Sequence, residues 1–167
     1  FAHLFEHLMF RGTRAVENFD LPVQMASGDN NAFTNNDYTD FYITLPKDNL
    51  ETALWLESDR MEGLDITPAK LEAEKKVVIE EFRQRYLNQP YGDQTMLLRA
   101  LAYKVHPYRW AAIGLATDHI AGATLADVES FYRAHYRPSN AILSISADME
   151  EERMLELAEK WFAPLAD

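Results

Sequence analysis

The sequence contains no cysteine, which excludes disulfides and thiolate metal ligands, so any metal site must use histidine, aspartate or glutamate. It also lacks a run of about 18 apolar residues, and this excludes a hydrophobic helix able to span a membrane. Positive charge is scarce, since 16 Lys and Arg stand against 27 Asp and Glu, giving a net charge of -11. This balance argues against a nucleic-acid partner, because a phosphate backbone requires a basic surface.

What is present is enough for one hydrophobic core: 47% of the 167 residues are hydrophobic and 12% are aromatic. This content and length predict a single domain over residues 1–167. We find no internal repeat, low-complexity stretch or linker. The cellular compartment is left open, because both exported and cytoplasmic proteins can lack cysteine.

Apolar periodicity and turn residues predict a chain that is mostly helical with a few strands. The predicted helices cover 1–10, 21–26, 48–61, 68–87, 93–103, 124–136 and 149–162, and the predicted strands cover 31–35, 39–45 and 141–146. This order indicates an α+β fold with helices packed on an antiparallel or mixed sheet. Three strands are few for so many helices, so either the sheet is small or further strands precede Phe1.

Three helix boundaries have specific signals. Gly12 is expected to end the first helix, and Asp20 is expected to cap the second. Thr67 followed by Pro68 predicts the start of the long helix, because threonine caps helices and proline is favoured at the first helical position.

The first predicted helix is apolar except for a few polar residues that are able to bind a metal ion. His3 and His7 are four residues apart, so a helix places both imidazoles on one face, with Cβ atoms about 5 to 6 Å apart. That spacing suits a tetrahedral Zn²⁺. Glu6 lies beside them and can act as the general base on a zinc-activated water without binding the metal. Burying these groups without a partner would cost free energy, which favours the metal over a packing coincidence.

A catalytic zinc needs a third protein ligand and an open position. On the long helix, Glu74, Val77, Val78 and Glu81 fall on one stripe, so these two carboxylates are expected to point inward. Glu80 is turned about 100° from Glu81 in a regular helix and remains an alternative ligand on geometry alone.

Three segments together resemble the pitrilysin/insulinase family of zinc peptidases. Residues 2–13 (AHLFEHLMFRGT) resemble its H-x-x-E-H signature, the inverse of the H-E-x-x-H order. Residues 74–81 (EKKVVIEE) resemble its downstream helix, in which two glutamates are seven apart. Residues 31–41 (NAFTNNDYTDF) are similar to its Asn-Ala-x-Thr segment. Within the family, the chain resembles the bacterial zinc proteases and the beta type of mitochondrial processing peptidase.

The resemblance implies a zinc endopeptidase domain, the zinc-binding N-terminal half of a two-half arrangement. Glu81 would be the third ligand beside His3 and His7, and Glu74 would orient a histidine from outside the ligand set. Glu6 would be the general base.

The resemblance also implies a fold, a substrate and a partner. The fold would be that of processing peptidase and the LuxS-like metallohydrolases, with a mainly antiparallel sheet whose first strands precede Phe1. Asn31 and Ala32 would align an extended peptide along an edge strand. A homologous second domain or subunit would supply an Arg and a Tyr, and a homodimer is compatible with this arrangement. Without that half, we expect the segment to be inactive.

Two alternatives belong to other classes. Some relatives of this fold are non-catalytic assembly subunits, but such partner halves usually lack part of the zinc site, whereas all four residues occur here. A metal-dependent hydrolase of another kind is the third hypothesis. His106, His119 and His135 have no second histidine at metal spacing, so we interpret them as ordinary loop and helix residues.

Overall fold

The computed structural model describes residues 1–166, and the chain divides into two compact units. The first unit contains Phe1–Leu8, Ala32–Asp40 and Ile66–Val128. The second unit contains Met9–Asn31, Phe41–Asp65 and residues 129–166.

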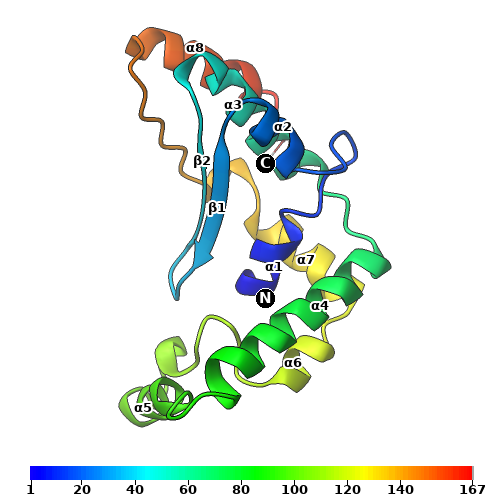
Figure 1. Ribbon diagram of the computed structural model, residues 1–167, viewed down its shortest axis with the longest axis vertical. Helices are drawn as coiled ribbons and strands as arrows, with labels where there is room; N and C mark the ends of the chain where they lie inside the picture. The colour runs from blue at the N-terminus through cyan, green and yellow to red at the C-terminus, as the bar shows by residue number, and fades with distance from the viewer. Residues whose placement is uncertain (167) are drawn as a thin grey trace. The chain divides into compact units, whose positions relative to one another are not determined.

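The first unit is built around one long helix. Its elements are α1 (Ala2–Leu8), α4 (Pro68–Phe82), the π-helical turn η2 (Arg83–Leu87), α5 (Gln94–Ala102), the short 3₁₀ helix η3 (Pro107–Arg109) and α6 (Thr117–Ala121). The long helix α4 contacts both α1 and α6, and it runs beside α1 in Figure 1. Apolar side chains are buried on both helices: Leu4, Phe5 and Leu8 on α1, and Leu71, Val78 and Phe82 on α4. Burial of this apolar area holds α1 on α4.

The start of α4 follows from its sequence. The Thr67 hydroxyl oxygen accepts a hydrogen bond from the Lys70 amide at 3.2 Å, and Pro68 occupies the first helical position. Both features confirm the predicted boundary. The predicted helix over 68–87 is α-helical only to Phe82 and then widens into η2.

The second unit packs helices around an aromatic and aliphatic core. Its elements are α2 (Asp20–Met25), the 3₁₀ helix η1 (Lys47–Asn49), α3 (Leu50–Gly63), the 3₁₀ helix η4 (Pro138–Asn140) and α8 (Glu151–Phe162). Helix α3 contacts both α2 and α8. The core consists of Val16, Phe19, Val23 and Leu56, with Phe10, Ile43 and Trp55 packed against it. A further helix, α7 (Leu125–His135), begins in the first unit and continues into the second.

Gly12 was predicted to end the first helix, but α1 ends earlier, at Leu8, and Gly12 belongs to the turn that follows it. Its φ of +87° lies in the left-handed region, and a Cβ there would meet the Glu17 carbonyl oxygen at 2.3 Å. Only glycine fits this position without strain.

The described part of the chain has one sheet, a hairpin of β1 (Asp29–Thr34) and β2 (Thr39–Thr44). The Asn35 side-chain oxygen accepts hydrogen bonds from the amides of Asp37 and Tyr38 at 2.8 and 2.9 Å, which closes the turn. Exposure alternates along both strands, and Phe41 and Ile43 share the more buried face, as their period of two predicts. Both predicted strands are therefore confirmed, although β1 begins at Asp29.

Three details differ from the sequence predictions. Residues 141–146 do not form a strand: Ala141 is extended, but the segment has no ladder partner within residues 1–166, and Ile142 is almost fully exposed. Asp20 does not cap α2; the Asn18 side-chain oxygen instead accepts from the Asp20 and Leu21 amides at 3.0 and 3.3 Å. Helix α6 was not predicted, because its five residues are too short for a periodic signal.

The chain is thus α+β, with many helices and a small antiparallel sheet, as predicted. Among residues 1–166, no helix has both the length and the apolar character needed to cross a bilayer.

Candidate metal centre

Helix α1 places two histidines one turn apart on the face that meets α4. The ring centroids of His3 and His7 are 4.9 Å apart. Leu4, Phe5 and Leu8 anchor the same short helix in the interior, so the imidazoles are held at the edge of the core. His3 is buried and His7 is partly buried.

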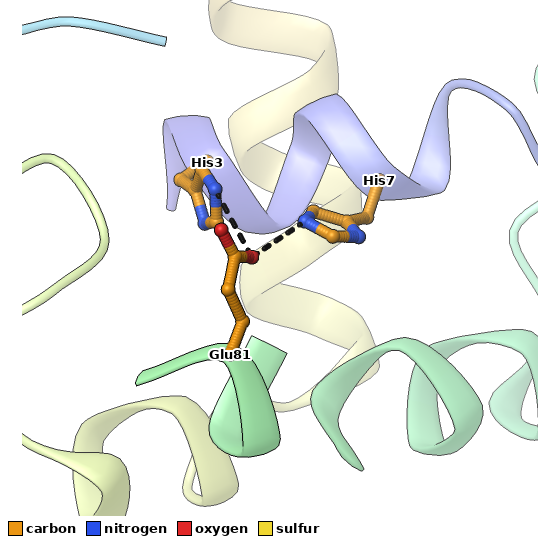
Figure 2. Close-up of side chains that lie close together, drawn as sticks. All are labelled: His3, His7 and Glu81. Atoms are coloured by element: carbon orange, nitrogen blue, oxygen red, sulfur yellow. Dashed lines mark ion pairs between the residues drawn. The ribbon is translucent and has the colours of Figure 1, made fainter. Parts of the chain in front are cut away.

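Glu81 on α4 points its carboxylate between the two rings. Oxygen Oε2 of Glu81 lies 3.5 Å from Nε2 of His3 and 3.3 Å from Nε2 of His7. Figure 2 shows the carboxylate directed at both imidazoles from the neighbouring helix. One ligand atom from each residue lies within 4.8 Å of the other two, the only such group of His, Asp and Glu among the described residues.

These three side chains fit a zinc ion. Ligand atoms about 2.0 to 2.1 Å from a tetrahedral zinc are about 3.3 Å from one another. The two separations to Glu81 Oε2 match that spacing. The donor set, two imidazole nitrogens and one carboxylate oxygen, is also one that catalytic zinc sites use, and it leaves a fourth position open.

The structure distinguishes between the two candidate carboxylates on α4. Glu81 has a side chain that is 19% exposed, whereas the side chain of Glu80 is 53% exposed and pairs with Arg83. Only Glu81 faces the histidines, since Glu80 lies about 100° further round the helix. Val77, expected on the buried stripe, is instead substantially exposed.

Glu74 lies two helical turns before Glu81 on α4 and supports the site from there. Its carboxylate, only 2% exposed, lies 3.3 Å from Nδ1 of His7. An Nδ1 proton donated to Glu74 leaves the Nε2 lone pair of His7 directed at Glu81 Oε2 and available to a metal.

The protein environment changes the pKa values of the two histidines in opposite directions. Burial lowers the pKa of His3, although the charge of Glu81 partly opposes this. Burial also acts to lower the pKa of His7, but the hydrogen bond to Glu74 and the charges of Glu81 and Glu74 outweigh it, so this pKa is raised. A metal must compete with the proton on His7, so metal affinity should fall in acid.

Glu6 lies on the same helix but takes no part in the ligand group. Its oxygen Oε2 accepts a hydrogen bond from the Thr34 hydroxyl at 2.5 Å. Thr34 is on β1, two residues after Ala32, so this bond connects the proposed base to the strand of the Asn-Ala-x-Thr segment. Ala32 is half-buried in the first unit, and Asn31 is exposed at the edge of the second.

Sequence reasoning missed two residues at this site. Thr34 lies in the Asn-Ala-x-Thr segment, but nothing in the sequence indicates its hydrogen bond to Glu6, 28 residues away. Arg85, in the π-helical turn, lies 3.0 Å from Oε1 of Glu81. The four-residue spacing of Glu81 and Arg85 could have predicted this ion pair, because oppositely charged residues four apart meet on a helix.

Comparison with known proteins identifies the family. The family model described as Insulinase (Peptidase family M16) matches residues 1–111, and a second, described as Peptidase M16 inactive domain, matches residues 122–166. The chain therefore belongs to peptidase family M16, the insulinase family, as the motif resemblance predicts.

Individual relatives match nearly the whole length of this chain. The chain is 35% identical over 166 residues to zinc protease PqqE of Helicobacter pylori, covering 98% of this chain and 37% of that protein. It is 27% identical to a probable mitochondrial-processing peptidase subunit beta of Schizosaccharomyces pombe, covering 98% of this chain and 36% of that one. The crystal structure of a protease from Helicobacter pylori matches with a TM-score of 0.95 and 34% identity, over 99% of this chain and 40% of that one. The chain thus spans well under half the length of these relatives.

Proposed function

We propose that this chain is the zinc-binding domain of a zinc-dependent endopeptidase. The observation that carries the proposal is the position of Glu81 Oε2, 3.5 and 3.3 Å from the Nε2 atoms of His3 and His7. Three lone-pair donors from two helices converge at the spacing that zinc requires. The names of the zinc protease and processing peptidase relatives support the same chemistry.

Each residue has a distinct task in this proposal. His3, His7 and Glu81 hold the metal, and Glu74 fixes the tautomer and orientation of His7. When bound, zinc supplies Lewis acidity to the substrate carbonyl and to the attacking water. Glu6 takes a proton from that water and delivers it to the leaving amine.

The peptide is expected to lie extended along β1. Ala32 and Asn31 belong to this strand, and the Thr34 hydroxyl on the same strand donates to Glu6. A peptide aligned by backbone hydrogen bonds would place its scissile bond by register more than by sequence. The full protein would contribute a homologous second half, as a domain or a subunit, whose Arg and Tyr stabilise the reacting carbonyl.

Substitution of Glu6 by Gln in the full-length protein tests the assignment. Proteolysis of an unfolded protein substrate should fall by about 10² to 10⁴, because a positioned general base contributes that much. Zinc content should stay at the level of the unsubstituted protein, since Glu6 is outside the ligand group. His3→Ala should instead lose the zinc. Unchanged proteolysis in Glu6→Gln would remove Glu6 from its role.

The same experiment addresses the non-catalytic assembly subunit. A protein of that class would show no peptidase activity before substitution, whether or not zinc was bound. Zinc bound at His3, His7 and Glu81 without peptide cleavage would favour a different hydrolase activity on this fold.

A further inference from the structure

The two oxygens of Glu81 have different partners. Oε2 faces the Nε2 atoms of both histidines, at 3.5 and 3.3 Å. Oε1 lies 3.0 Å from Nη2 of Arg85, one helical turn further along the chain. One cation thus engages the oxygen that is turned away from the histidine pair.

The position of Arg85 depends on a local change in the helix. Residues Arg83–Leu87 form a π-helical turn directly after α4. Such turns are rare and are often found at functional sites. The widened turn begins two residues after Glu81, and Arg85 within it reaches back to Oε1.

We propose that Arg85 is a positioning residue that keeps Glu81 a one-oxygen ligand. This inference rests on the proposed zinc site. A carboxylate can bind a metal through one oxygen or through both, and the second oxygen would take the position that a catalytic zinc keeps open for water or substrate. Because Arg85 holds Oε1, only Oε2 is presented to the histidine pair.

The effect of Arg85 on metal affinity should be small. Its side chain is 67% exposed, and exposed ion pairs contribute little free energy because water screens them. Geometry at the metal, and not binding strength, is therefore the property that Arg85 controls. This distinguishes its role from that of His3, whose removal deletes a ligand.

Arg85→Ala in the full-length protein, loaded with Co²⁺ in place of zinc, provides the test. Visible absorption reports the coordination number, because five-coordinate Co²⁺ absorbs more weakly than four-coordinate Co²⁺. The matched control is Arg83→Ala. Arg83 belongs to the same π-helical turn, but it pairs with the outward-facing Glu80, at 3.6 Å, and not with Glu81.

We expect Arg85→Ala to weaken the Co²⁺ absorption while zinc affinity changes by less than about fivefold. Arg85→Lys should largely restore the spectrum, since Lys four residues after Glu forms the same type of pair. Arg83→Ala should leave the spectrum unchanged. An unaltered spectrum in Arg85→Ala, with metal bound, would overturn the role of Arg85 alone. Failure of the unsubstituted protein to bind Co²⁺ or zinc would overturn the metal site and this inference together.

Discussion

Both units of the chain bury ionisable side chains, but they surround these side chains with different partners. In the second unit, the side chain of Arg60 is 1% exposed. It is enclosed by the rings of Phe10, Phe19 and Phe41, whose centroids are 5.6, 4.4 and 4.4 Å away. It also donates hydrogen bonds to both carboxylate oxygens of Glu57 at 2.5 to 2.8 Å.

At the histidine pair of the first unit, the carboxylates of Glu81 and Glu74 face the rings, and Arg85 pairs with the Glu81 oxygen that is turned away from them. There, the Nε2 atoms of both histidines face Oε2 of Glu81, and each of these three atoms can donate a lone pair to a metal. A cation from outside the chain would satisfy them together. The comparison shows that burial of charge alone does not indicate a binding site. What indicates one is a set of lone-pair donors that converge at metal-ligand spacing.

The largest effect should come from breaking the internally neutralised cluster. Arg60→Met should lower the free energy of unfolding by about 3 to 5 kcal/mol, because it leaves the Glu57 carboxylate without its cation and removes the cation–π contacts. Chemical denaturation measures this. The control is Arg133→Met, which removes an exposed pair with Glu129 at 3.8 Å and should cost less than about 0.5 kcal/mol. A similar cost for both variants would contradict the comparison.

The next effect concerns added metal. Free zinc at about 100 times its dissociation constant should raise the free energy of unfolding by about 2.7 kcal/mol, if unfolding releases the metal. The same addition should leave His3→Ala unchanged. The destabilisation caused by Arg60→Met should be equal with and without zinc, since its contacts lie within the other unit. A zinc-dependent cost for Arg60→Met would show that the two clusters are coupled.

A smaller effect should follow from loss of the carboxylate behind His7. Glu74→Gln should weaken zinc binding by about 10- to 100-fold, because groups that orient a metal-bound histidine typically contribute that much. Competition with a chelator of known affinity measures the change. Glu80→Gln, on the exposed face of the same helix, is the matched control and should bind zinc normally. Equal affinity for the two variants would exclude a supporting role for Glu74.

The smallest effect should come from the bond between the hairpin and Glu6. Thr34→Val keeps the shape of the side chain but removes the donor to Glu6, so turnover should fall on the order of tenfold while zinc affinity is unchanged. Thr44→Val, at an exposed position of the same hairpin, should have no effect on turnover. Loss of zinc in Thr34→Val would indicate that the hydroxyl supports the ligands and not the base.

Much of this site is local in origin and could be predicted from the sequence. The four-residue spacing of His3 and His7 places them on one face of any regular helix. Thr67 and Pro68 start α4 through contacts within a single turn, and alternation predicts the face of β2 that carries Phe41 and Ile43. These features depend on neighbours a few residues away, so periodicity and capping rules are sufficient to find them.

Tertiary structure decided what local rules left open. Glu81 and Glu80 are adjacent and chemically identical, and only the packing of α4 against α1 determines which one faces the histidines. Residues 141–146 have the composition of a strand, but a strand also requires a hydrogen-bonded partner, and the described chain provides none. An arginine is usually exposed, so the sequence alone would place Arg60 at the surface. The rings of three phenylalanines that are distant in sequence enclose it in the core instead. For Glu81 and Arg60 the deciding contacts join residues far apart in the chain, and for residues 141–146 a distant strand partner is missing from the described chain. Local periodicity cannot specify such long-range relations.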